Sequence, residues 1–400
     1  MSFFSEKLNK FKPSLTVKIS QKARELKRVG KEIVSLSSGE PDFDTPLHIK
    51  QKAISAINEG FTKYTAVDGV ISLKEAIVEK FKIDNLIEYN TEQITVGVGG
   101  KHVIYNLFMS TLNTNDEVII PSPYWVSYPE IVSLCGGKPI IIETNEDENF
   151  KISANKLEKA INKNTKWVIV NSPSNPTGSV YTKTELSEIA KVLMKHENVW
   201  ILSDDIYEHI IYDDYEFYNI INVEPSLYER SFIVNGVSKA YSMTGWRIGY
   251  GAGSKELINC MSKIQSQSTT NPSSISQMAA IAALSSNKEF LKDWIDQFTK
   301  RREFVFNSFN QIKGLKCLKP KGAFYLFVSC QGLLSKKRKN GQEIKSDLDF
   351  ADYLLEQAGV AVVPGVAFGK SPYFGISYAS SMKQLDFAIK KIKEAVSHLE

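Results

Sequence analysis

The stretch from Ser231 to Tyr250, SFIVNGVSKAYSMTGWRIGY, constrains the fold of this chain more than any other. It begins with an apolar, β-rich run, breaks at Asn235-Gly236, and then presents a single lysine, Lys239, with Arg247 following in the same loop. A loop lysine is ordinarily a solvated surface charge. Here the apolar runs on both sides predict strands that enclose the loop. A dry lysine beside a fixed cation favours its neutral amine, which is the form that attacks a carbonyl group.

The segment SKAYSMTGWRIGY is similar to the lysine signature of the class I and II aminotransferases, which are pyridoxal-phosphate enzymes. Within them the chain most resembles the bacterial aspartate and aspartate/prephenate aminotransferases. The similarity extends from the loop SGEPD, at residues 38–42, to the C-terminal helix, and the motifs occur in the family's order. The resemblance implies that Lys239 binds pyridoxal 5'-phosphate covalently and that Arg247 binds its phosphate group.

The resemblance also implies an α/β fold of the fold-type I transferases. We expect a large domain with a mixed, mostly parallel seven-stranded sheet, and a smaller α+β domain. The large, cofactor-binding domain is expected over residues 47–286, and the small domain over residues 1–46 together with 287–400. An amphipathic pattern predicts a long helix from Lys288 to Ile312 between them, with Asn287 as its N-cap.

A glycine turn between a strand and a helix forms a candidate anion site. The apolar run from Ile94 to Val98 is followed by Gly99-Gly100 and then by a helical pattern. Free amides and the positive end of the helix dipole converge at such a turn, although the pattern alone is common. The resemblance assigns Gly99 and Gly100 to the cofactor phosphate. Lys101 resembles a lysine that meets the distal carboxylate of dicarboxylic substrates, which favours an acidic amino acid over an aromatic one.

Two loops that follow predicted strands carry further candidates. Trp125 ends the run PSPYW, where a tryptophan is more often a core residue than a cofactor platform. The family places the matching residue over the pyridine ring. Asn175 lies in NSPSNPTG, a loop whose conformation proline and glycine restrict. By resemblance Asn175 donates to the cofactor phenolic oxygen and to the substrate carboxylate, and Trp125 also contacts substrate.

Asp204 and Tyr207 form a D-x-x-Y motif at the end of a predicted strand. A carboxylate there can pair with the pyridine nitrogen and keep it protonated, so that the ring accepts electrons. A tyrosine three residues on can bond the phenolic oxygen. Spacing alone leaves a plain acidic loop open, whereas the resemblance makes Asp204 and Tyr207, with Lys239, the catalytic group.

Gly39 and Tyr64 lie in loops before the large sheet. Gly39 lets a ligand approach the main chain closely, and the family uses this position for the substrate carboxylate. The tyrosine that matches Tyr64 reaches the phosphate of the neighbouring subunit's site. We therefore expect a homodimer with shared active sites, although a loop tyrosine is usually a packing residue.

The chain departs from its family at Gly375, in YFGISYASS, where the family has an arginine. That arginine binds the substrate α-carboxylate as a bidentate fork. Three explanations are open. The gene is substituted, which the family-like flanking residues favour; the enzyme holds its substrate in another way; or the protein binds the cofactor without efficient transamination.

We expect transamination between L-aspartate and 2-oxoglutarate, giving oxaloacetate and L-glutamate, with prephenate as a further acceptor. Lys12, Ser14 and Thr16 are candidates for a contribution near the mouth of the site. Two other interpretations remain. A related enzyme would be a C–S or β-elimination lyase, and a non-enzymatic protein would bind pyridoxal phosphate with transamination impaired by Gly375.

Composition bears on partners and location. Charged residues make up 24% of the chain and the net charge is +4, with no basic stripe of the kind that binds nucleic acid. The cysteines lie far apart, at positions 135, 260, 317 and 330, so neither a disulfide framework nor a metal site is expected. The sequence shows neither an apolar leader nor an apolar run of membrane-spanning length. We therefore expect a cytoplasmic protein that binds no membrane.

Overall fold

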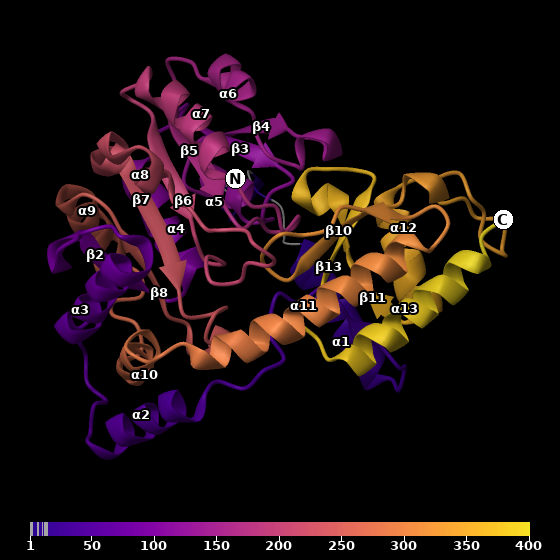
Figure 1. Cartoon of the computed structure of the whole chain (residues 1–400), viewed down its shortest axis with the longest axis horizontal. Helices are drawn as coiled ribbons and strands as arrows, with labels where there is room; N and C mark the ends of the chain where they lie inside the picture. Colours follow the sequence, from indigo (N-terminus) through magenta and orange to yellow (C-terminus); the bar gives the residue numbers. More distant parts are fainter. Residues whose placement is uncertain (1–2, 6–7, 10, 12–14) are drawn as a thin grey trace.

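The chain forms two lobes of unequal size, joined along a long helix (Figure 1). The computed structural model describes residues 3–5, 8–9, 11 and 15–400, apart from the side chains of Thr16 and Ser20. The larger lobe is built on a seven-stranded sheet and the smaller one on a four-stranded sheet. The predicted α/β fold, with a larger and a smaller part, is confirmed. The exact domain bounds at residues 47 and 286 stay a prediction.

The large sheet has the order β2-β8-β7-β6-β5-β3-β4. Strand β8 is antiparallel to both of its neighbours, and the other pairs are parallel, so the sheet is mixed and mostly parallel as predicted. The carboxyl ends of parallel strands meet at one edge, where such folds bind ligands. The strands are β2 (Ile94–Gly97), β3 (Glu117–Ser122), β4 (Lys138–Glu143), β5 (Thr165–Asn171), β6 (Trp200–Asp204), β7 (Ser231–Gly236) and β8 (Gly249–Ala252).

Helices cover both faces of this sheet because its strands are apolar on both sides. Side chains alternate between the faces with the period of two that a strand requires: Ile233 of β7 joins one core cluster, whereas Phe232 and Val234 join the other. The large-lobe helices are α2 (Leu47–Asn58), α3 (Ile71–Lys80), α4 (Gly100–Thr111), α5 (Tyr128–Leu134), α6 (Ala154–Ala160), α7 (Lys183–Met194), α8 (Ile220–Val223), α9 (Lys255–Ser266) and α10 (Ser274–Leu284).

The small lobe combines the two ends of the chain. Strand β1 near the N-terminus pairs in parallel with β11, so Val34 lies opposite Val360. The four-stranded sheet is antiparallel, in the order β12-β13-β10-β9. The elements are α1 (Leu15–Arg28), β1 (Val34–Ser35), β9 (Lys316–Cys317), β10 (Tyr325–Ser329), α12 (Asp347–Tyr353), β11 (Val360–Ala361), β12 (Val363–Pro364), β13 (Tyr373–Ser377) and α13 (Met382–Ser397).

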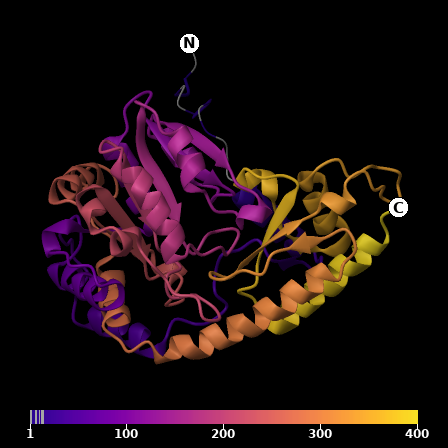
Figure 2. The same cartoon turned by 45° about the horizontal axis from the view of Figure 1, so that its top comes forward.

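The predicted connecting helix is α11 (Glu289–Asn310), which runs from beneath the large lobe to the small lobe (Figure 2). The prediction that Asn287 caps it is wrong. Lys288 occupies the N-cap position without a side-chain cap bond. Its ammonium group instead pairs with Asp84, 2.5 Å away. Among the helices of the described residues, none combines the length and the apolar character needed to cross a membrane.

Candidate active site

A cavity of about 360 Å³ lies between the two lobes, beside the carboxyl ends of β5, β6 and β7. The sheet topology brings to it loops that are far apart in sequence. All of the predicted site residues except Gly99 and Tyr64 line this cavity: Gly39, Gly100, Lys101, Trp125, Asn175, Asp204, Tyr207, Lys239, Arg247 and Gly375.

Lys239 lies in the loop after β7 and points across the cavity to the loop before α2. Its Nζ donates to the Gly39 carbonyl oxygen at 2.5 Å. Burial lowers the pKa of Lys239 to about 8, against the opposing pull of Glu40, and Arg247 lowers it further. The same two loops are tied together by Ser242, whose carbonyl oxygen accepts from Thr45 Oγ1 at 2.7 Å. The setting is the dry one that the flanking strands predicted.

Arg247 and the start of α4 form the cationic end of the cavity. The guanidinium donates to the carbonyl oxygens of Thr244, at 3.1 Å, and Val98, at 3.2 Å. Gly99 has φ 84°, and a Cβ at this position would collide with the Arg247 side chain, so only glycine fits. The helix N-terminus and this cation together suit an anion such as a phosphate.

Lys101 follows on the same helix and faces Trp125, with its Nζ 5.1 Å from the ring centroid. Burial, and then the charge of Arg247, lower the pKa of Lys101. No ion pair engages Lys101 within the described part of the chain. A cation without a carboxylate partner is therefore available to a ligand at this side of the cavity.

Asp204 lies buried at the end of β6. Tyr128 of α5 donates its hydroxyl to Asp204 Oδ2 at 2.5 Å. Burial raises the pKa of Asp204 to about 6, and the bond from Tyr128 opposes that rise. Tyr128 was not predicted from the sequence, because its partner Asp204 lies 76 residues away along the chain.

Tyr207 is buried and its hydroxyl lies 2.6 Å from the hydroxyl of Tyr325, on β10 of the small lobe. Burial raises the pKa of Tyr207 well above its usual range. The Tyr325 hydroxyl also packs against Gly39, where a Cβ would collide with it. Tyr325 thus joins the two lobes at the cavity. It was missed because it lies in an uninterrupted apolar strand that carries no other signal.

The loop after β5 brings Asn175 to the cavity. Its backbone N–H donates to Asn171 Oδ1 at 3.0 Å, and Asn171 Nδ2 donates to the Asp204 carbonyl oxygen at the same distance. The loop is thereby fixed to β6. Among the described residues no hydrogen bond engages the side-chain amide of Asn175, which remains available to a ligand.

Gly375 is buried in β13, between Phe327 of β10 and Val363 of β12. A Cβ at this position would lie 2.8 Å from the ring of Phe368. The Phe368 ring therefore occupies the space that the first atoms of a larger side chain at position 375 would need.

Comparison with known proteins decides the family. The family model described as "Aminotransferase class I and II" matches residues 31–392. The chain belongs to this family. It is 54% identical over 395 residues to a probable aspartate/prephenate aminotransferase of Rickettsia felis, covering 99% of this chain and 97% of that protein. It is 51% identical to the aspartate/prephenate aminotransferase of Cereibacter sphaeroides, covering 98% of both.

Solved structures agree with the fold. The aspartate aminotransferase from Rhizobium meliloti matches with a TM-score of 0.97 and 48% identity over all of both chains. The Thermus thermophilus aspartate aminotransferase with maleate matches with a TM-score of 0.91 and 39% identity, over 99% of this chain and all of that one. These matches confirm the fold-type I assignment and the aminotransferase prediction.

Apart from Gly99, one predicted site residue does not line this aminotransferase's cavity, and three further candidates concern side chains outside the described residues. Tyr64 is 91% exposed and does not line it. Lys12 and Ser14 lie outside the described residues, as does the side chain of Thr16. Within one chain, therefore, Tyr64 does not contribute to the cavity.

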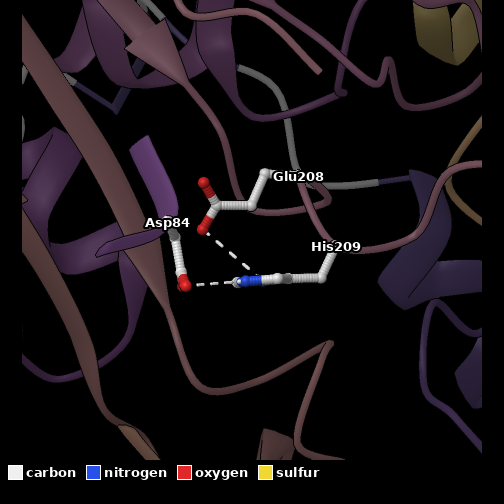
Figure 3. A group of neighbouring side chains, drawn as sticks. All are labelled: Asp84, Glu208 and His209. Carbon is white, nitrogen blue, oxygen red and sulfur yellow. Dashed lines mark hydrogen bonds and ion pairs between the residues drawn. The ribbon is translucent and has the colours of Figure 1, made fainter. Parts of the chain in front are cut away.

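Directly after Tyr207 in the chain, the buried carboxylate of Glu208 is the centre of a polar network, and Figure 3 shows it beside Asp84 and His209. Glu208 pairs with Lys80 of α3 and accepts from Asn235 of β7 at 2.7 Å. His209 lies 3.0 Å from Asp84, which also pairs with Lys288. The network connects the loop that carries Asp204 to the strand that leads to Lys239.

Proposed function

We propose that this class I and II aminotransferase uses pyridoxal 5'-phosphate to transfer the amino group of L-aspartate to 2-oxoglutarate, giving oxaloacetate and L-glutamate. One observation carries the proposal: a lysine of lowered pKa shares a dry cavity with a buried carboxylate and with a cationic helix start. These are the three features that a cofactor with an aldehyde, a basic ring nitrogen and a phosphate requires.

The residues present fit that cofactor. Lys239 would bind its aldehyde carbon, Asp204 its ring nitrogen, and Arg247 with the amides of Gly99 and Gly100 its phosphate. Tyr207, Trp125 and Asn175 surround the place left for the ring. Asp204 has no cationic partner within ion-pair distance in the described residues, although it is buried. A protonated ring nitrogen supplies the charge that this carboxylate lacks.

When bound, the cofactor supplies an electron sink for the bond broken at the substrate carbon. The chain's own residues do the rest. Asp204 keeps a positive charge at the ring nitrogen. Lys239, once its amine is free, can take the proton from the substrate carbon and return it, because a pKa of about 8 lies near the operating pH. Tyr207 and Asn175 supply hydrogen-bond donors that fix the geometry.

An acidic substrate is favoured by the cation at Lys101 and by the relatives. The Thermus thermophilus structure contains maleate, a dicarboxylate. Several relatives are named for aspartate and prephenate together, which supports prephenate as a further acceptor. Lys101 is the residue we assign to the carboxylate distal to the amino group.

We infer a homodimer with shared sites from an exposed apolar surface. On α2, Leu47, Ile54 and Ile57 are 65%, 56% and 52% exposed, and Tyr64, a little further along the chain, is also exposed. A second copy of the chain would cover this surface and receive Tyr64 at its phosphate site. The cytoplasmic location remains a prediction from sequence.

The test is spectroscopic. Purified protein loaded with pyridoxal phosphate should show the absorbance of the lysine-bound cofactor, and L-aspartate should convert it to the amine form. Borohydride reduction followed by peptide mapping should put the label on Lys239. Release of pyruvate and ammonia from cysteine conjugates would instead identify a lyase. Binding without conversion by any amino acid would identify a non-enzymatic protein.

A further inference from the structure

The two sides of the cavity differ in charge. Four charged side chains line it, and all of them belong to the large lobe: Lys101, Asp204, Lys239 and Arg247. The small-lobe side, among the described residues, contributes no charged group. Around Gly375 the cavity is lined by the apolar side chains of Val363, Phe368 and Ile376, and the polar groups on this side are the neutral hydroxyls of Ser37, Tyr325 and Ser377.

Of the three cations that line the cavity among the described residues, one is left for a substrate carboxylate. Under the proposed function Lys239 and Arg247 are committed to the cofactor, so Lys101 remains. Aspartate has two carboxylates. The one beside the amino carbon would meet the apolar side at Gly375, with only neutral donors such as the Asn175 amide near it.

We propose that this site also takes ω-amino acids, whose single carboxylate is remote from the amino carbon, as amino-group donors on a par with dicarboxylic α-amino acids. The inference rests on the proposed function and narrows its substrate class. β-Alanine is aspartate without its α-carboxylate, and 4-aminobutanoate is glutamate without it. These donors keep the carboxylate that pairs with Lys101 and place hydrogen against the apolar side at Gly375, so no charge is buried without a partner.

The overall transfer balances without a further reactant. With β-alanine and 2-oxoglutarate, the donor carbon loses one C–H bond and its C–N bond and becomes an aldehyde, giving 3-oxopropanoate. The 2-oxo carbon gains a C–H and a C–N bond and becomes L-glutamate. The donor is oxidised, the 2-oxo acid is reduced, and the oxygen exchanges through water.

The decisive experiment compares matched donors on the wild-type protein loaded with pyridoxal phosphate. The single-turnover rate constant per donor concentration is measured from the cofactor absorbance for L-aspartate and β-alanine. A neutral hydrogen bond changes such a constant by about tenfold or less. We expect the two donors to differ by less than about tenfold, and a larger preference for aspartate overturns the proposal.

A variant series isolates the missing charge. Gly375→Arg should raise the preference for aspartate over β-alanine at least about thirtyfold, which is the lower end of the effect expected when a buried charge gains a partner of opposite charge. Gly375→Met, which has similar length and no charge, should not raise it. Because the Phe368 ring contacts Gly375, the arginine is also introduced with Phe368→Ala. Lys101→Gln should slow both donors and leave their ratio unchanged.

Equilibrium binding supplies a readout without turnover. Calorimetry compares maleate with propanoate, a monocarboxylate. The wild-type protein should bind them within about tenfold of each other, and Gly375→Arg should favour maleate. Tight, selective maleate binding by the wild type overturns the inference. One outcome separates the two proposals: no amine converts the cofactor, and maleate is still not preferred over propanoate. In that case the proposed function is wrong, whereas the inference that the site lacks a second group for a carboxylate is supported.

Discussion

At the scale of single residues, two groups of opposite charge, Lys239 and Asp204, line the same cavity. Burial acts on both by disfavouring the charged form, so it lowers the pKa of the lysine to about 8 and raises that of the aspartate to about 6. Between pH 6 and 8 both groups are therefore charged although their surroundings disfavour the charged form, and this lowers the free energy of unfolding. The cofactor-free protein carries strain at neutral pH that a bound cofactor would relieve.

Lys239→Met should stabilise the cofactor-free protein at pH 7. The pKa of Lys239 is about 8 in the folded protein and 10.5 in the unfolded chain. The contribution of Lys239 to the free energy of unfolding therefore rises as pH rises from 8 to 10.5, and below pH 8 the buried ammonium group destabilises the fold by the full amount. A shift of this size corresponds to about 3 kcal/mol, or a Tm increase of about 3 °C. Calorimetry at pH 7 and at pH 10.5 measures it. A gain that persists at pH 10.5, or an equal gain in Lys239→Arg, would contradict the explanation.

Tyr128→Phe should weaken cofactor binding in acid. Loss of the hydroxyl removes the bond that holds down the pKa of Asp204, so that pKa rises above 6. A rise of one unit lowers the ionised fraction about fivefold at pH 6 and scarcely at pH 8. Fluorescence titration with pyridoxal phosphate at both pH values measures this. Tyr105→Phe, in the same core cluster, is the control, and a pH-independent loss would argue against the mechanism.

At the scale of elements, the segment after β6 directs its side chains in two directions, toward the cavity and toward the polar network around Glu208. Asp204 and Tyr207 face the cavity, whereas Asp205 and Glu208 face the network. Burial, and then the charge of Glu208, raise the pKa of Asp205 to about 8. The ammonium group of Lys80 pairs with Glu208, and the raised pKa of Asp205 favours its protonated form.

Lys80→Met should destabilise the large lobe by about 3–5 kcal/mol, because it leaves the Glu208 carboxylate buried without its cation. The double variant Lys80→Met/Glu208→Gln should recover part of that loss. Urea unfolding curves measure both. The exposed pair Lys191–Glu188 is the control, and Lys191→Met should cost less than about 1 kcal/mol. Equal losses at the two lysines would show that the network contributes little.

Contiguous motifs made much of the site predictable. Lys239 and the Asp204–Tyr207 pair follow strands that the apolar pattern identified, and a parallel sheet brings such strand ends together. Tyr128 and Tyr325 were not found because their partners are 76 and 118 residues away in sequence. The pairing of Lys80 with Glu208 was missed for the same reason: a buried ion pair depends on packing that sequence spacing does not report.

At the scale of the whole molecule, the proposed homodimer would complete each site with Tyr64 from a second copy of the chain. Tyr64 is exposed in one chain. The exposed apolar residues of α2 precede it closely in sequence. A shared site has a testable consequence, because in a hybrid dimer a Lys239 lesion on one subunit and a Tyr64 lesion on the other fall in the same site and leave the second site intact.

Mixing Tyr64→Ala and Lys239→Ala subunits should therefore restore activity. Half of the reassembled dimers are hybrids, and each hybrid has one intact site of two, so about a quarter of the wild-type sites return. Denaturation and joint refolding, followed by assay, measures the gain over separately refolded samples. A hybrid with no gain would show that Tyr64 does not act across the interface. A Tyr64→Phe partner tests the hydroxyl alone.

The pairing of β1 with β11 joins residues near positions 34 and 360, and Gly375 follows later still. During synthesis β8 emerges roughly 120 residues before Gly375, an interval of about 6–24 s. Under the proposed function, the nascent protein therefore presents the Lys239 amine before the C-terminal part of the opposing lobe has been synthesised. Chains stalled near residue 320 on the ribosome should already capture the aldehyde, and a failure to do so would make completion of the chain a condition for loading.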